Sequence, residues 1–445
     1  MTKARRDGLY LVLLGSAIFV LIGSALENAV PVSTVDFRVV YYSARCLLEH
    51  RDPYNESDLD YVYRTQGGAT AKDSPQIRRS ERRYNYLPTA FPITLPFAIF
   101  PFGPAHLLWL AFTACSVILA SYLMWDIGAQ FAPILAGALA CLSLANSELF
   151  LILGNPAGIA IGLCVIATWC FMRERLEYIG ILCFALSLML KPHDSGLIWL
   201  YFLLAGGVLR RRAWQVLVVV IILSIPAILW VSHVAPNWPH ELQSILATYS
   251  SHGDVNDPGP SSMASHGIGM VISLQAVISV FRDDPRFYNP LTYFVCGALL
   301  LVWLVKVLRS PNRSNTTWFA LAPIAALSML PIYHRIYDAR LLLITIPACA
   351  ILWKEGGAVA WFALIVEAIG ILFTGGVPWA IFFAFVKHAH LPSAISSGMP
   401  LIVMQVFPAP LAVLCVGVFF LWVFVRCPPS GVETLSSETE GVRNV

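Results

Sequence analysis

Charged side chains are scarce in this 445-residue sequence: Asp, Glu, Lys and Arg together make up 12% of it, whereas soluble domains carry about 25%. Hydrophobic residues make up 58%, and the mean hydropathy is +0.70. Glycine-rich phosphate loops, zinc-site spacings and the serine elbow of hydrolases are also missing. These absences exclude a soluble catalytic domain and nucleotide hydrolysis as an energy source, and they indicate an integral membrane protein.

Apolar runs of about 15 to 25 residues recur along the whole chain, and each is long enough, or nearly so, to cross a hydrocarbon core about 30 Å thick. We therefore predict an all-α polytopic membrane protein that forms one domain over residues 1–427, with about twelve transmembrane helices. The runs lie near 8–26, 105–125, 128–145, 148–171, 178–191, 195–209, 213–232, 290–309, 318–333, 339–353, 358–375 and 401–425.

Basic residues in the short loops predict that both termini are cytoplasmic. If the chain alternates through those runs, one face collects the basic residues near the N-terminus and in every second loop. Two polar segments, about 30–88 and 233–289, then lie outside. Cys46 is the one cysteine expected there, so no external disulfide is predicted. We expect a monomer in the inner (plasma) membrane, with its active site facing the periplasm or exterior and a disordered cytoplasmic tail over 428–445.

The first outer segment begins with residues 33–48, in which Val39/Val40, Ser43/Ala44 and Leu47/Leu48 form a stripe that predicts an amphipathic helix along the membrane surface. Asp36 falls in its first turn. One interpretation is that Ser33 caps the helix and Asp36 completes a variant capping box. The other is that Asp36 is a general base at the membrane edge. Further along, four prolines between Leu87 and Phe102 prevent a helix of spanning length and indicate an interfacial or re-entrant segment.

Two short polar groups interrupt the apolar runs on the same side. Lys191 stands between two runs, where a charge is costly and often functional, although a lysine can also extend to the interface. The other group, Tyr333-His334-Arg335-Ile336-Tyr337-Asp338-Ala339-Arg340, places two arginines and a histidine close together. Guanidinium groups hold phosphate oxygens in a bidentate geometry, so this group predicts an anion site.

Metal ligands are not evident from spacing. Asp58-Leu59-Asp60 mimics the metal-binding motif of nucleotide-sugar enzymes, but it lies in the outer segment, away from cytoplasmic nucleotide sugars. We therefore predict a site without metal or cofactor.

Several short motifs follow one another in a fixed order. They are Asp36 with Val40-Tyr41-Tyr42-Ser43-Ala44, Arg51-Asp52-Pro53-Tyr54, Tyr84-Asn85-Tyr86-Leu87-Pro88, Leu153-Gly154-Asn155-Pro156, Leu190-Lys191-Pro192, and His334-Arg335-Ile336-Tyr337-Asp338. In these motifs and their order the chain resembles glycosyltransferase family 87, membrane enzymes of the GT-C class that take sugars from polyprenyl-phosphate donors. The resemblance implies a GT-C-like bundle.

The resemblance also implies roles for individual residues. Asp36 would deprotonate the acceptor hydroxyl as it attacks the anomeric carbon, with inversion and release of polyprenyl phosphate. The expected donor-phosphate ligands are Lys191, His334, Arg335 and Arg340, and the expected sugar or acceptor contacts are Tyr42, Tyr86, Asn155 and Asp338. The sugar would be a hexose, with mannose as the first candidate and arabinofuranose as the second. The acceptor would be a lipid or glycan, and the other partners are membrane lipids and no nucleic acid.

A transporter or flippase for a lipid-linked or small anionic solute is the alternative hypothesis. It would use the same cationic residues, but it would also need an opening on the inner face and a matched internal repeat, and no convincing repeat is present.

Overall fold

The fold is known from a computed structural model, which describes residues 1–30, 33–66, 83–260, 271–309, 314–376 and 408–426. Within these ranges the chain is helical, and its β pairing is limited to one isolated bridge between Val271 and Arg335. The predicted all-α class is therefore confirmed. The predicted tail over 428–445 lies outside the described residues.

Seven helices in the described ranges are long and apolar enough to cross a membrane. They are α1 (Lys3–Ala29), α6 (Phe102–Gly128), α7 with α8 (Pro133–Ala145 and Leu149–Leu153), α12 (Gly207–Val234), α15 (Pro285–Arg309), η3 with α17 (Ile336–Thr345 and Ile346–Glu355) and α22 (Pro408–Arg426). The shorter helices α9 (Ala157–Arg173), α10 (Glu177–Leu190), α11 (Pro192–Leu204), α16 (Ser314–Leu327) and α18 (Gly357–Phe373) pack among them. A bundle of membrane-spanning helices is confirmed, while the count of about twelve stays a prediction.

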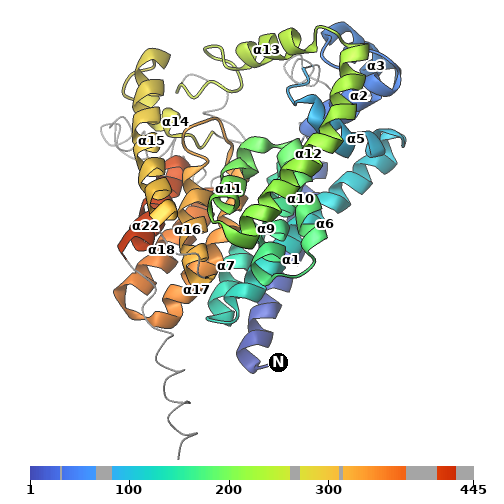
Figure 1. The fold of residues 1–445 in the computed structure, drawn as a ribbon. Coiled ribbons are helices and arrows are strands. Elements are labelled where there is room, and N and C mark those ends of the chain that lie inside the picture. The colour runs from blue at the N-terminus through green and yellow to red at the C-terminus, as the bar shows by residue number, and fades with distance from the viewer. Residues whose placement is uncertain (31–32, 67–82, 261–270, 310–313, 377–407, 427–445) are drawn as a thin grey trace, which may run out of the picture.

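The helices at the edge of the bundle expose large apolar side chains, as lipid-facing helices do. In α12, Leu229 is 65% exposed, and in α15, Phe294 is 75% exposed. Water would make such surfaces costly, whereas a hydrocarbon solvent does not. The helices α12 and α15, whose places Figure 1 shows, therefore have the surface of a membrane protein.

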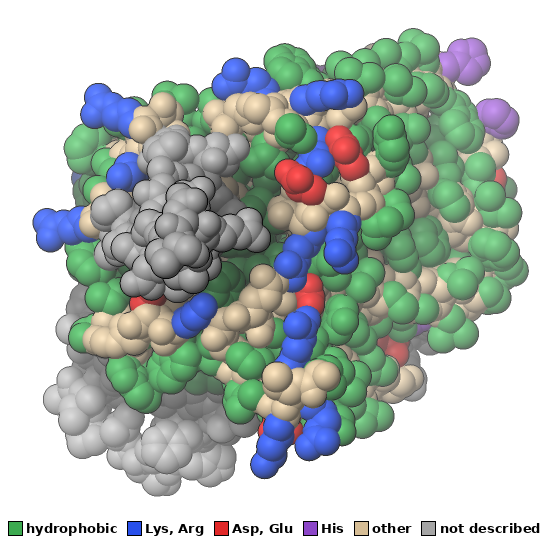
Figure 2. Space-filling model, turned by 60° about the horizontal axis from the view of Figure 1, so that its bottom comes forward, with side chains coloured by type: hydrophobic (Ala, Val, Ile, Leu, Met, Phe, Trp, Pro, Cys, Tyr) green, Lys and Arg blue, Asp and Glu red, His purple; other side chains and the backbone are tan. Residues whose placement is uncertain are grey.

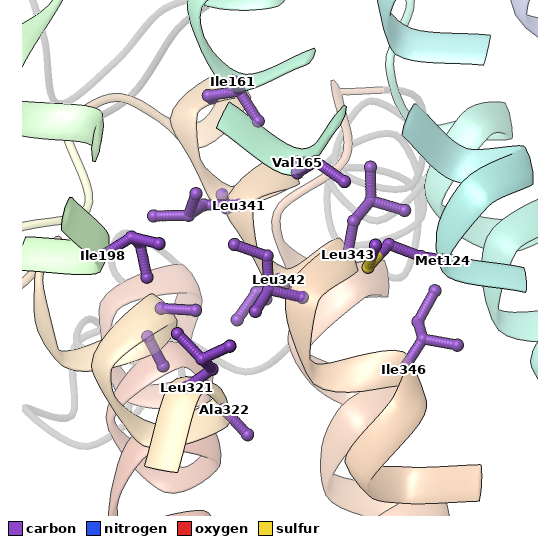
Figure 3. Close-up of a cluster of buried hydrophobic side chains, with 14 of the residues drawn as sticks. Met124, Ile161, Val165, Ile198, Leu321, Ala322, Leu341, Leu342, Leu343 and Ile346 are labelled. Carbon is purple, nitrogen blue, oxygen red and sulfur yellow. The ribbon is translucent and has the colours of Figure 1, made fainter. Parts of the chain in front are cut away.

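The centre of the bundle is η3, whose ten residues are all buried. A 3-10 helix of this length is uncommon, because its hydrogen-bond geometry is poorer than that of an α-helix. Figure 3 shows its leucines among side chains of α6, α9, α11, α16 and α17. The labelled members of this cluster are Met124, Ile161, Val165, Ile198, Leu321, Ala322, Leu341, Leu342, Leu343 and Ile346.

One predicted run is wrong in its boundaries. The sequence predicts a single apolar run over 148–171, but the structure breaks it at residues 154–156, between α8 and α9. Gly154 has a φ of 63°, which ends α8, and Pro156 lacks the amide hydrogen that a continuing helix needs. Residues 149–153 instead belong to the candidate span that starts at Pro133. The break leaves Asn155 between two helix ends.

The proline-rich stretch after residue 87 forms only short helices, as predicted. A three-residue 3-10 turn, η1 (Pro88–Ala90), leads into α5 (Phe91–Ala98). Eight residues of α-helix rise about 12 Å, far less than the hydrocarbon thickness.

The two long polar segments lie together at one end of the bundle (Figure 1). The first forms α2 (Val35–Leu48) and α3 (Glu56–Thr65), and the second forms α13 (Trp238–Tyr249) and α14 (Leu274–Ser279). The Tyr54 and Trp238 rings are 6.0 Å apart, and the Tyr249 hydroxyl donates to the Arg83 carbonyl at 3.2 Å. Most of α2 is buried, and its predicted place along the membrane surface is not confirmed.

Basic residues gather at the opposite end of the bundle. There Asp126 pairs with Arg5 at 2.6 Å and with Arg173 at 2.8 Å, which joins the start of α1 to the end of α9. Figure 2 shows Lys and Arg side chains over this end. The pairing matches the expectation that these residues share one face, and the side of the membrane that this face meets stays a prediction.

Candidate functional site

Asp36 enters the site from the first turn of α2. The N-cap is Thr34, whose φ of 62° is left-handed and whose side chain makes no capping hydrogen bond. The interpretation that Ser33 caps this helix with Asp36 in a capping box is therefore wrong. The Asp36 carboxylate instead accepts a hydrogen bond from Asn155 Nδ2 at 2.7 Å.

The helix break between α8 and α9 brings Asn155 to this carboxylate. The Ile152 carbonyl accepts from the Thr34 amide at 2.7 Å, and the Gly154 carbonyl accepts from the Trp109 indole at 2.8 Å. A Cβ added at Gly154 would stand 2.6 Å from Phe37 Cβ, so only glycine lets α8 approach α2 this closely. The start of α2 and the end of α8 are thereby fixed together.

Asn155 joins three elements through one side chain. Its Nδ2 donates both to Asp36 and to the Tyr337 hydroxyl, the latter at 2.9 Å, and its Oδ1 accepts from the Ala157 amide at 2.8 Å. This arrangement orients the amide group so that its donors point to Asp36 on α2 and Tyr337 on η3.

Burial raises the pKa of the Asp36 carboxyl above its ordinary value, while the Asn155 hydrogen bond and the charges of Arg335 and Lys191 lower it in part. A carboxylate with a raised pKa binds a proton more strongly. Asp36 is therefore a better general base than a carboxylate in water, provided that the pH keeps it ionised.

Lys191 occupies the junction between α10 and α11, where Pro192 starts the second helix. Its Nζ lies 2.9 Å from Asp338 Oδ1 and 3.4 Å from Asp194 Oδ2. Burial alone would lower the pKa of Lys191, but these two carboxylates outweigh it and raise that pKa above its ordinary value. The site therefore holds a permanent positive charge beside Tyr337, whose ring centroid is 5.5 Å from Nζ.

His334 and Arg335 precede η3 on an extended segment. The Asp338 carboxylate accepts from the Arg335 amide at 2.8 Å, and the His334 carbonyl accepts from the Ile272 amide at 2.8 Å. The Arg335 guanidinium donates to the Tyr333 hydroxyl and to the Val255 carbonyl. Arg335 is half-buried, and its positive charge lowers the pKa of Asp36. Its guanidinium therefore belongs to the part of the site that contains Asp36.

Tyr86 lies within electrostatic reach of the same carboxylate. Burial, followed by the charge of Asp36, raises the pKa of Tyr86 well above its ordinary value. Six of the residues predicted for the site are therefore brought to it by contacts or charge, in addition to Asp36: they are Tyr86, Asn155, Lys191, His334, Arg335 and Asp338.

The structure places the other two predicted residues elsewhere. Tyr42 packs in an aromatic group, stacked on Phe102 at 5.9 Å and edge-on to Tyr63 at 5.0 Å. Arg340 is 1% exposed and donates to backbone carbonyls at 143, 371 and 374. The contacts described for these two side chains do not join them to Asp36.

Several site residues were not predicted. Tyr333 and Tyr337 border Arg335 and Asn155, and Asp194 pairs with Lys191. Asp194 could have been found from the sequence, because it stands three residues after Lys191 in Lys191-Pro192-His193-Asp194.

A group of possible metal ligands also lies here. One ligand atom from each of His193, Asp194 and His334 lies within 4.8 Å of the others, so these residues could hold a metal ion. Asp58 and Asp60, by contrast, each pair with an arginine.

The model of glycosyltransferase family 87 matches residues 84–334, more than half of the chain. The chain therefore belongs to that family, and it is a membrane enzyme that transfers a sugar. The matched region contains Tyr86, Asn155, Lys191 and His334, and it starts beyond Asp36. No curated protein and no solved structure is found to be similar to the chain.

Proposed function

We propose that this glycosyltransferase moves a hexose from a polyprenyl-phosphate donor to a lipid or glycan acceptor, with inversion at the anomeric carbon. Mannose is the first candidate sugar and arabinofuranose the second. The observation that carries the proposal is the pairing of a half-buried carboxylate, Asp36, with fixed cations on Lys191 and Arg335 at the same end of the bundle.

The reaction needs a base on one side of the sugar and positive charge on the other. Asp36 takes the proton of the acceptor hydroxyl while that oxygen forms a bond to the anomeric carbon. The bond from this carbon to the phosphate oxygen breaks, and its electron pair stays on the phosphate. The growing negative charge is the main barrier, and cations already in place lower it without reorganising.

The neighbouring residues hold these groups in position. Asn155 fixes the Asp36 carboxylate through its 2.7 Å hydrogen bond, and Asp338 fixes Lys191 and the backbone of Arg335. Lys191 and Arg335 are the groups that we assign to the donor phosphate, because both ring nitrogens of His334 face protein oxygens, on Ile332 and Asp194. The polyprenyl tail would occupy the surrounding lipid and supply apolar binding, while the cations supply orientation.

The family match supports an enzyme, and nothing in the comparisons supports a transporter or flippase. The test is transfer by the purified chain in detergent, with polyprenyl-phosphate mannose or polyprenyl-phosphate arabinofuranose and an extract of envelope lipids as acceptors. We expect a glycosylated product whose anomeric configuration is opposite to that of the donor. Release of free sugar alone, or retained configuration, would contradict the proposal.

We further propose that the site faces the periplasm or exterior of the plasma membrane. Single cysteines at His193 and Arg335 in a cysteine-free background should react with an impermeant thiol reagent added outside intact cells. Cysteines at Arg211 and Lys354, both exposed at the basic end, should react only after the membrane is opened. The reverse labelling would place the site on the cytoplasmic side.

A further inference from the structure

Two side chains beside Lys191 leave buried polar atoms without a hydrogen-bond partner. His334 is 0% exposed and Asp194 is 1% exposed. Both carboxylate oxygens of Asp194 and Nε2 of His334 lack a hydrogen bond. Buried polar atoms in this state cost free energy, and each calls for an explanation such as a bound ion.

The His334 ring is oriented by the backbone. Its Nδ1 lies 3.2 Å from the Ile332 carbonyl, which requires a hydrogen on Nδ1. In the neutral ring, Nε2 then carries a lone pair, and this lone pair faces Asp194 Oδ1 at 3.4 Å. A metal-binding histidine usually donates its second ring nitrogen to a carbonyl in the same way.

His193 completes the group from the other side. Its Nε2 lies 3.6 Å from the same Asp194 oxygen, and its ring centroid is 5.0 Å from that of His334. An ion about 2.0–2.2 Å from each ligand separates neighbouring ligand atoms by about 3.4 Å in a tetrahedral site. The two distances to Asp194 already match that spacing. The His193 side chain is 33% exposed, so an ion has a route from solvent.

Lys191 lies beside the other oxygen of Asp194, away from the two histidines. Its ammonium lies 3.4 Å from Oδ2 of Asp194, whereas both imidazole nitrogens approach Oδ1. The carboxylate thus has one oxygen toward the lysine and one toward the histidines.

We propose that His193, Asp194 and His334 form a binding site for one divalent transition-metal ion, with Zn²⁺ as the preferred occupant. Two imidazole nitrogens and one carboxylate oxygen are a typical three-ligand set for zinc, which leaves a fourth position for water or a substrate oxygen. Mg²⁺ and Ca²⁺ prefer oxygen ligands and should bind poorly. Spacing along the sequence predicts no metal here, because His334 lies far along the chain from the other two ligands.

The test is metal binding itself, which is independent of the proposed sugar transfer. The full chain, carrying a tag without histidines, is stripped with a chelator and titrated with Co²⁺ in detergent. We expect visible d–d absorption that saturates at one equivalent, is displaced by Zn²⁺ and is unaffected by Mg²⁺. Zn²⁺ should also raise the melting temperature of the wild-type chain, because a ligand that binds only the folded state stabilises it.

His193→Gln is the decisive variant, because this partly exposed side chain can be replaced without leaving a buried charge. It should weaken Co²⁺ binding by at least about tenfold, since even the loss of an outer partner costs that much. His240→Gln, which changes an exposed histidine on α13, is the matched control and should bind like the wild type. The absence of a one-equivalent signal, or equal affinities for the two variants, would overturn the proposal and leave the His334 nitrogen satisfied by a proton.

Discussion

Two groups of buried polar residues meet η3 from different sides, and they use their charges differently. The Asp36 cluster (Asp36, Asn155, Lys191, Arg335 and Asp338) joins side chains of opposite charge. The Arg340 cluster (Arg340, Thr374, Thr345, Glu367 and Glu148) is centred on a guanidinium that donates mainly to backbone carbonyls.

The Arg340 cluster has the features of a structural element. The carbonyls at 143 and 371 belong to the last turns of α7 and α18, where helices leave acceptors without partners. Arg340 therefore caps two helices with one side chain, a position favoured by the negative ends of their dipoles. Burial of a charge therefore does not by itself identify a reacting group. The partners of the charge distinguish a structural group from a reacting one.

The largest expected effect is on stability, from Arg340→Met. This change leaves the capped carbonyls and the nearby Glu148 and Glu367 without their cation, and it should lower the free energy of unfolding by about 3 kcal/mol or more. Thermal unfolding in detergent measures the loss. Arg64→Met, which removes an arginine that is 63% exposed, is the control and should cost under about 1 kcal/mol. A stable Arg340→Met enzyme with impaired donor binding would instead return Arg340 to the phosphate.

Arg335→Ala should act on the donor. A charge-assisted contact to phosphate contributes about 1.5–3 kcal/mol, so kcat/KM for the polyprenyl-phosphate sugar should fall by roughly ten- to a hundredfold. Arg335→Lys should recover part of this loss, because a point charge cannot reproduce the bidentate fork. Steady-state kinetics with saturating acceptor measure the effect, and Arg282→Ala removes a comparable exposed charge as the control. Unchanged donor kinetics in Arg335→Ala would remove this residue from the site.

Gly154→Ala should disturb the Asp36 cluster by changing the backbone between α8 and α9. The left-handed φ and the 2.6 Å approach to Phe37 Cβ both oppose a side chain, so about 1–3 kcal/mol of stability should be lost. Turnover per folded molecule should fall as well, because Asn155 moves away from Asp36. Gly103→Ala meets no atom within 4 Å and serves as the control in both assays. Wild-type stability in Gly154→Ala would contradict the close packing of α8 on α2.

The smallest expected effect is a shift in pH dependence from Asn155→Ala. The base must be ionised to act, so kcat/KM should rise with pH until the pKa of Asp36 is passed. The Asn155 hydrogen bond lowers this pKa, and its loss should therefore move the acidic limb of the profile to higher pH. Profiles of wild type and variant, measured at low donor concentration, test this. An acidic limb that stays in place would show that it reports another group.

The sequence could predict which residues gather at one end of the bundle, because apolar runs of spanning length force their polar junctions to alternate between two faces. Asp36, Lys191 and His334 were found in this way, whereas Asn155 fell inside a predicted apolar run and was expected from the family resemblance. The direction of a side chain from its helix was harder to predict, as Tyr42 shows. It lies on the predicted helix, but packing of α2 against Phe102 and Tyr63 turns it into an aromatic group.

The position of Arg340 could have been predicted only by recognising η3. Residues 338 and 340 were treated as members of one turn, yet on a 3-10 helix two successive steps rotate a side chain by about 240°. Asp338 therefore points to Lys191 while Arg340 points to α7 and α18. The approach of His334 to Asp194 is a contact between distant segments, and no local pattern carries it.

The central claim is that Asp36 is the base of the transfer, and Asp36→Asn tests it most directly. Asparagine keeps the shape and can still accept the hydrogen bond from Asn155, but it cannot take a proton. The measurement is the initial rate of sugar transfer per folded molecule, with the melting temperature recorded on the same preparation. We expect a rate at least about a hundredfold below wild type with an unchanged melting temperature. A rate equal to that of the wild type would contradict it.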